Sequence, residues 1–200
     1  MDSSNVKDVK KSIRKIIWRI MEEKNIARFP RPVYGRIPNF LGAEIAASKL
    51  STTSIWRKAS VVKVNPDSPQ KHVRYRALVE GKTLIMPTPR LRKGFLLLDP
   101  KRIPVASYGH ASTIRGAFIY GTRVDLDGLP RVELIVAGSV AVSKDGSRLG
   151  KGGGYGEIEY GILRELRLVD ESTPVVTTVH EIQVLDDGSI PRERHDLPVD

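Results

Sequence analysis

The sequence has 200 residues, of which 40% are hydrophobic and 28% are charged, a balance typical of a globular chain with a core of its own. It has no cysteine, no signal-peptide pattern and no apolar run of about 18 residues, which excludes disulfides, thiolate chemistry and a membrane-spanning helix and favours a cytoplasmic protein. The formal net charge of +10 indicates an anionic partner, either nucleic acid or an anionic small molecule.

The first predicted element is an amphipathic helix over residues 5–24. Its apolar residues recur at helical spacing and form one stripe: Val9, Ile13, Ile16, Ile17 and Ile20. Its basic residues fall on the opposite side: Lys7, Lys10, Lys11 and Arg14. The pattern by itself predicts that this basic side is a solvated helix face.

A proline-rich connector and a series of alternating elements follow. Three prolines within residues 29–40 predict an extended segment on the surface. Asn39 is expected to cap a helix that continues to about residue 50. The elements expected next are a strand at 59–64, a helix at 68–80, a strand at 83–87 and a weaker strand at 104–108.

The strongest strand signal is the continuous β-rich run at 132–142, which is typical of a sheet covered on both faces. A helix at 155–166 and a buried strand at 174–179 are expected after it. Because strands alternate with helices, the sequence predicts an α/β fold with a largely parallel sheet in a single domain.

Four glycines surround one lysine at residues 150–154, between the strongest strand and a helix. Glycines let bare main-chain N–H groups converge on an anion, and the helix N-terminus adds a partial positive charge. The loop is no Walker A motif, and Tyr155 stands where a dinucleotide-binding fingerprint has its third glycine. From spacing alone, phosphate binding and a flexible glycine turn both remain open.

The stretch DGSRLGKGGGY, residues 145–155, resembles the signature of the 5-formyltetrahydrofolate cyclo-ligase family. Three weaker anchors agree with it: KKSIR at 10–14, GKTLIMPTP at 81–89 and RHDLPVD at 194–200. The resemblance implies a three-layer α/β/α fold of the NagB/RpiA/CoA-transferase-like kind over residues 1–200. It also implies that ATP and Mg²⁺ drive closure of 5-formyltetrahydrofolate into 5,10-methenyltetrahydrofolate.

The resemblance also assigns residues to the reaction. By position, it implies an ATP site made of Lys10, Arg14, Arg148, Gly150, Lys151, Gly152, Gly153, Gly154 and Tyr155. Arg148 and Lys151 are the expected catalytic residues, since phosphoryl transfer requires mainly positioning and charge compensation. The expected magnesium ligand is Glu157, and Asp196 and Asp200 are expected either to help hold the ion or to belong to a solvated tail.

The match departs from the family at two places, which leaves the substrate open. Gly156 and Glu157 replace the family's Tyr-Asp, and the Glu-x-x-Thr stretch after an early strand is missing, with Asp67 as the nearest acid in an expected turn. The pattern is closer to a divergent branch of cyclo-ligase-like paralogues, linked to thiamine metabolism rather than to folate. The family's last strand is expected to be absent.

The partner therefore remains open between two classes. The first is a nucleotide with a small-molecule substrate, either folate or another anionic heterocycle. The second is RNA, bound by a non-catalytic module through a basic surface made of Arg28, Arg31, Arg36, Arg90, Arg92 and Lys93.

Overall fold

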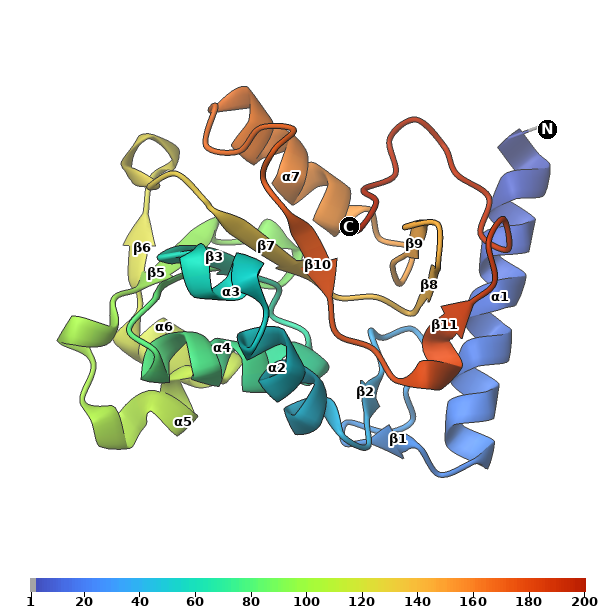
Figure 1. The fold of residues 1–200 in the computed structure, drawn as a ribbon, viewed down its shortest axis with the longest axis horizontal. Helices are drawn as coiled ribbons and strands as arrows, with labels where there is room; N and C mark the ends of the chain where they lie inside the picture. Colours follow the sequence, from blue (N-terminus) through green and yellow to red (C-terminus); the bar gives the residue numbers. More distant parts are fainter. Residues whose placement is uncertain (1–2) are drawn as a thin grey trace.

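A six-stranded sheet forms the centre of the computed structural model, which describes residues 3–200 (Figure 1). Its strands, in spatial order, are β10 (Val175–Thr177), β7 (Leu134–Ala137), β3 (Val61–Val64), β4 (Thr83–Pro87), β5 (Phe95–Leu98) and β6 (Thr122–Val124). The first four run parallel to one another, whereas β5 and β6 are antiparallel to their neighbours. The predicted largely parallel sheet is confirmed.

Helices cover both faces of this sheet, which confirms the three-layer architecture (Figure 1). One face carries α2 (Ala43–Ser51), α3 (Ser54–Lys58), α4 (Lys71–Val79), α5 (Tyr108–Ala111) and α6 (Ile114–Tyr120), and the other carries α7 (Tyr155–Glu165). Successive strand residues alternate between the two cores: Leu84 packs with the first group of helices, whereas Ile85 packs with Leu163 of α7.

The helix α1 (Ser3–Glu23) lies beside the main sheet, against a smaller structure (Figure 1). That structure is a three-stranded sheet of β11 (Val184–Leu185), β8 (Ala141–Ser143) and β9 (Arg148–Leu149), with the short pair β1 (Ala27–Arg28) and β2 (Asn39–Phe40). A second core joins them through Ile17, Met21, Phe40 and Val140. Between residues 3 and 200, no helix combines the length and the hydrophobicity of a membrane span.

The buried side of α1 differs from the predicted one. Val9 and Ile16 are 38% and 46% exposed, whereas Lys10 is only 5% exposed and lies on the inner side with Ile17 and Met21. The apolar stripe is therefore rotated, and Lys10 does not belong to a solvated face. Its ammonium group is buried because two carboxylates of the C-terminal segment bind it.

The strand predicted at 132–142 is two strands in different sheets. The chain leaves β7 at Gly138 and enters β8 three residues later. A Cβ at Gly138 would lie 2.8 Å from Asp67 Oδ2 and 3.1 Å from Ile37 Cγ1, so the close approach of these segments requires glycine at the crossing. Apolar continuity cannot show such a change of sheet, since both strands are buried.

Other expectations in the first half of the chain are also corrected. The segment 104–108 is no strand: Pro104 leads into a 3₁₀ turn and then α5. Asn39 caps no helix, because it lies in β2 and its amide donates to Phe29 O, while α2 begins after Gly42 at φ 86°. The predicted helix at 68–80 begins as the 3₁₀ turn η1 (Ser68–Gln70) before α4.

Candidate active site

A cavity of about 600 Å³ opens where β3, β4 and β7 end at their carboxyl ends. Its walls come from the segments that follow these strands, from α1, and from the glycine loop, residues 150–154, with the first turns of α7. Ligands of open α/β sheets collect at this edge, where the loops between strands and helices meet. The fold therefore brings the two basic segments predicted from the sequence to one site.

The glycine loop presents its main chain to this cavity. No residue within 3–200 accepts a hydrogen bond from the main-chain N–H groups of residues 151–154. Gly152 and Gly154 have φ values of 101° and 68°, which only glycine adopts readily, and Gly154 is the N-cap of α7. The open N–H groups and the helix N-terminus together make a concave donor surface for an anion.

Arg14 brings a positive charge to the loop from the facing helix. Its Nε donates to Gly150 O at 2.7 Å, and no acceptor for its two terminal nitrogens is found in the described part of the chain. Burial lowers the pKa of Arg14, and the carboxylates of Asp196 and Glu157 partly oppose that shift. On the far side of the loop, Lys151 binds Asp67 at 3.0 Å and is 42% exposed.

Lys10, one helical turn before Arg14, lines the same cavity but is already paired. Its Nζ lies 2.8 Å from Glu193 Oε2 and 2.6 Å from Asp196 Oδ2. Burial opposes its charge, but the hydrogen bonds to Asp196 and Glu193 outweigh burial, so the pKa of Lys10 is raised. Glu193, His195 and Asp196 bring three possible metal-ligating atoms within 4.8 Å of one another, yet the ammonium of Lys10 binds both carboxylates.

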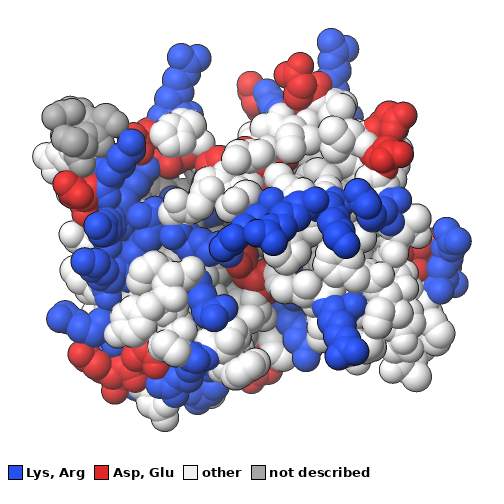
Figure 2. Space-filling view, turned by 180° about the vertical axis from the view of Figure 1, so that it is seen from behind, with Lys and Arg blue, Asp and Glu red and all other residues white. Residues whose placement is uncertain are grey.

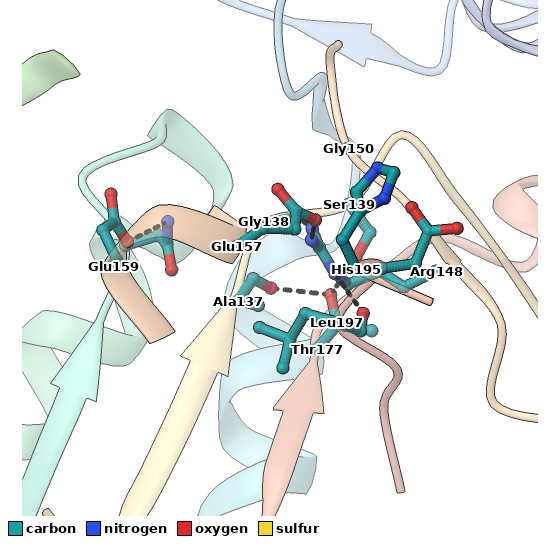
Figure 3. A network of polar contacts seen from close by, with 12 residues as sticks. Ala137, Gly138, Ser139, Arg148, Gly150, Glu157, Glu159, Thr177, His195 and Leu197 are labelled. Carbon is teal, nitrogen blue, oxygen red and sulfur yellow. Dashed lines mark hydrogen bonds and ion pairs between the residues drawn. The ribbon is translucent and has the colours of Figure 1, made fainter. Parts of the chain in front are cut away.

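Arg148 is enclosed at the base of the glycine loop, with its side chain 3% exposed (Figure 3). Its Nε donates to Leu197 O at 3.0 Å, its Nη1 to Gly138 O at 2.9 Å, and its Nη2 to Glu157 Oε1. One guanidinium thus ties together the crossing after β7, the C-terminal segment and the first turn of α7. Its contacts are those of a group that holds the walls of the cavity in place.

A buried polar cluster, which sequence reasoning missed, forms the floor. Lys63 of β3 donates to Glu159 of α7, and Asn65 contacts both; Lys63 and Glu159 have side chains 1% and 3% exposed. Arg74 of α4 holds the main chain below, because it donates to the carbonyl oxygens of Asn65 and Asp67. A signal existed: Lys63 interrupts a valine-rich strand, and Glu159 lies four residues before Leu163 on the inward side of α7.

The remaining predicted residues fall in different places. Tyr155 lines the cavity with its ring against the loop, where a Cβ at Gly153 would lie 3.0 Å from its Cδ2. Asp67 makes no side-chain cap and binds Lys151 instead. Asp200 lies outside this cavity: its carboxylate accepts from Val175 N at 2.9 Å on β10 and lines a second cavity. The structure does not bring Asp200 to Glu157.

Basic side chains gather in a band across one face of the molecule (Figure 2). Of the six basic residues considered for RNA, Arg36 and Arg90 line the cavity, whereas Arg31 binds Glu22 and Arg28 bonds to nearby main chain. Lys93 lies over the ring of Phe118 at 5.8 Å. These residues therefore divide among several local environments.

Comparisons with known proteins show the family of the chain. The sequence model of the 5-formyltetrahydrofolate cyclo-ligase family matches residues 6–200. The chain belongs to this family.

Similar proteins carry related names. The chain is 45% identical over 193 residues to the methenyltetrahydrofolate synthase domain-containing protein of Bos taurus. The aligned region covers 96% of this chain and 51% of that protein. The protein of the same name from Danio rerio is 43% identical over 198 residues, with 98% and 52% covered. The chain thus spans about half the length of these relatives.

Solved cyclo-ligase family structures share the fold. The 5,10-methenyltetrahydrofolate synthetase of Aquifex aeolicus aligns with a TM-score of 0.56 and 23% identity, over 96% of this chain and 87% of that one. The enzyme of the same name from Mycoplasma pneumoniae aligns with a TM-score of 0.54 and 13% identity, over 100% and 96%. At these identities the likeness supports the fold.

Proposed function

We propose that this domain binds ATP with Mg²⁺ in the cavity and drives a cyclo-ligase reaction. In that reaction a formyl or carboxyl oxygen is phosphorylated so that a neighbouring nitrogen closes a ring, as in the conversion of 5-formyltetrahydrofolate to 5,10-methenyltetrahydrofolate. The observation that supports it best is the set of main-chain N–H groups at 151–154, without acceptors among residues 3–200 and beside the guanidinium of Arg14. Such a surface suits anionic groups, among them the phosphates of a nucleotide.

The residues divide into two roles in this proposal. The N–H groups of the glycine loop, Arg14 and Lys151 bind the phosphates, and Lys7 adds a long-range charge from the cavity wall. Lys10 and Arg148 act as positioning residues, because their charges are buried and already hydrogen-bonded within the protein, whereas the side chain of Lys151 is 42% exposed beside Asp67. Arg148 is expected to matter for catalysis through the placement of Glu157 and the loop.

The reaction needs no nucleophile from the protein. The formyl oxygen of the substrate attacks the γ-phosphorus, the bond to the β-phosphate oxygen breaks, and ADP leaves. The neighbouring substrate nitrogen then attacks the activated carbon, and inorganic phosphate leaves with the oxygen. The protein aligns the two substrates and compensates charge on the transferring group, which is the contribution that phosphoryl transfer requires most.

Glu157 fits a magnesium site made largely by phosphates. Its Oε1 accepts from Arg148, its Oε2 has no partner among residues 3–200, and the residue lines the cavity. Mg²⁺ bound to nucleotides commonly takes one or two carboxylates, with phosphate oxygens and water as its other ligands. When bound, the ion would supply charge neutralisation of the phosphates. Asp200 has no part in this proposal, and Asp196 holds Lys10.

The substrate in this proposal is folate or another anionic heterocycle. Asn65, Pro66 and Asp67 follow β3 and line the cavity, at the place where the family resemblance leads one to expect a glutamate. This difference supports a paralogue with a different heterocycle, such as one of thiamine metabolism, as the second form of the proposal.

Two measurements test the proposal in order. Calorimetric titration with Mg-ATP should show binding that weakens at least tenfold in Arg14→Gln and is unchanged in Lys15→Gln, an exposed lysine on the same helix. Absent ATP binding by the wild-type chain would overturn the nucleotide site. An assay for 5-formyltetrahydrofolate-dependent ATP hydrolysis then tests the substrate, and ATP binding without turnover there would favour the other heterocycle.

RNA binding is the competing outcome. A module that binds RNA through its surface should retain that binding in Arg14→Gln, and its affinity should fall steeply with salt concentration. Such behaviour without Mg-ATP binding would replace the enzyme proposal.

A further inference from the structure

Glu159 places a buried carboxylate oxygen at the floor of the cavity without a partner. Its Oε2 accepts from Lys63 and, at 3.2 Å, from Asn65 Nδ2, but no described residue donates to its Oε1. Figure 3 shows this second oxygen on the side of Glu159 away from the dashed contact. Among the side chains that the structure describes, those of residues 5–200, the only enclosed atoms that lack a partner are Gln70 Oε1 and Ser147 Oγ, so Glu159 Oε1 opens onto the cavity that the residue lines.

Glu159 Oε1 is a hydrogen-bond acceptor that a ligand with a donor group could bind. The residue as a whole is 2% exposed, so bulk water reaches it only through the cavity. Lys63 balances its charge but uses the other oxygen, which leaves a charged acceptor in a largely desolvated place. An unmatched acceptor of this kind is unfavourable until a ligand N–H binds it, and it repels anions and carbonyl oxygens.

A divalent cation is the less suitable ligand. Unlike Glu157, whose side chain is 22% exposed, Glu159 has a side chain only 3% exposed beside the ammonium group of Lys63, so Mg²⁺ could not keep its water ligands there. In the part of the chain that the structure describes, the only group of three metal-ligating side chains is Glu193, His195 and Asp196, and Glu159 is not among them. The floor therefore offers one hydrogen-bond acceptor and no coordination sphere.

Part of the cavity wall is apolar. Pro66, Pro89 and Ile114 contribute apolar surface to the cavity, and α7 contacts the turn η2 (Pro89–Leu91). The glycine loop with its open N–H groups lies at the start of α7, one helical turn before Glu159. A ring bound at the floor would therefore lie beside a polyphosphate bound at the loop.

We propose that Glu159 is a specificity-determining residue that accepts a hydrogen bond from the N–H edge of an amino-substituted nitrogen heterocycle. This inference rests on the proposed function, because it assigns the ring of the substrate to the floor of the same cavity. Asn65 and Lys63 are positioning residues that hold the carboxylate with Oε1 open. A site built to bind an N–H group rejects the analogue that lacks it.

The test uses two probes that differ in one group: a 2-amino-4-oxopteridine, and the same ring with a methyl group in place of the amino group. Calorimetric titration of the wild-type chain should show at least tenfold tighter binding of the amino probe. Glu159→Gln should reduce that ratio, and Lys63→Met/Glu159→Leu should bring it close to one. Glu165→Gln, an exposed residue of the same helix, should leave the ratio unchanged.

The double variant keeps the test valid if Glu159→Gln fails to fold, because replacing both members of a buried ion pair by apolar residues is commonly tolerated. A folded double variant that still prefers the amino probe as the wild type does would overturn the inference, as would a wild type without preference. Mg-ATP titration of the same variants should show unchanged affinity. Absent ATP binding in the wild type would defeat the proposed function alone, since the probe ratio is measured without nucleotide.

Discussion

The two sides of the cavity treat polar groups in opposite ways. On the loop side, the N–H groups at 151–154 and the ends of Arg14 lack acceptors within residues 3–200. On the floor, Lys63, Asn65 and Arg74 are each less than 10% exposed and all are hydrogen-bonded within the protein. The donors on the loop side are available to bind a ligand, whereas the hydrogen-bonded side chains of the floor hold the surrounding elements in place.

The difference shows how a site can be both stable and receptive. A buried charge without a partner is strongly unfavourable, so the protein keeps its unpaired donors on main chain and on half-buried side chains. The groups that it buries completely are used to connect elements: Lys63 joins β3 to α7, and Arg74 joins α4 to the segment after β3. Glu159 is the exception, since it is both buried and half open.

The largest expected effect is loss of the floor. Arg74 is only 1% exposed. Burial lowers its pKa to about 10, so its side chain stays protonated at neutral pH. Arg74→Met would leave the carbonyl oxygens of Ser112, Asn65 and Asp67 without this donor. The free energy of unfolding should fall by about 3–5 kcal/mol, as expected when several buried acceptors lose their partner. Urea denaturation measures it.

Arg76→Met is the matched control on the same helix. Its side chain is 41% exposed and pairs with Glu80 at 4.0 Å, so its loss should change stability by less than about 1 kcal/mol. Equal losses in the two variants would show that the floor is no more important to stability than the surface of α4.

The next effect concerns Arg148, a paired group on the loop side. Lysine at this position keeps a positive charge but cannot reach three acceptors that lie in different directions. Arg148→Lys should destabilise the fold by about 1–3 kcal/mol and also weaken Mg-ATP binding, because Glu157 and the loop lose their common anchor. Arg164→Lys, whose partner Glu171 is 93% exposed, should change neither. Unchanged ATP affinity in a folded Arg148→Lys would contradict the positioning role.

The sequence predicted the loop side better than the floor, for a physical reason. Main-chain donors need glycines in a row, which are visible at 150–154, and the basic residues of α1 stand at helical spacing. The floor depends on a pairing across 96 positions between Lys63 and Glu159, which no local pattern encodes. The alternation of strands and helices predicted the layers of the fold, but the sequence analysis missed β5, β6 and α6. The crossing at Gly138 could not be predicted, because it depends on tertiary contacts with Asp67 and Ile37.

A smaller loss of stability is expected from alanine at Gly154, where the backbone conformation is strained but no neighbouring atom clashes. Gly154 has φ 68°, and nothing lies within 4 Å of the position where a Cβ would stand. Gly154→Ala should therefore cost about 1–2 kcal/mol of stability through backbone strain alone, and reorientation of the loop should weaken Mg-ATP binding. Gly161→Ala, with equal space but within α7, should instead stabilise by up to about 1 kcal/mol. Tm and ATP titration report both, and an unaffected ATP affinity in Gly154→Ala would argue against main-chain recognition.

The smallest effect, and the one limited to a pH window, is expected where α1 meets the C-terminal segment. The hydrogen bond from Lys10 lowers the pKa of Glu193, against the opposing effect of burial. A carboxylate whose folded pKa is lowered stabilises the protein above its ordinary pKa of 4.5, and that contribution is lost as the pH falls through the folded value. The raised pKa of Lys10 has its effect at alkaline pH. Its stabilisation is present below the ordinary lysine pKa of 10.5 and is lost as the pH rises through the pKa of Lys10 in the folded protein.

Lys10→Met should therefore be less stable than the wild type at neutral pH, and the gap between them should narrow as the pH falls below about 4. Urea denaturation between pH 3 and 7, with hydrogen exchange over residues 190–200, measures the gap and its location. Lys11→Met, exposed on the same helix, should show no such pH dependence. A difference in stability that stays constant across this range would mean that Lys10 stabilises the segment through packing of its carbon chain. Lys10 would then resemble the floor residues in being buried, but its ion pairs would contribute little to stability.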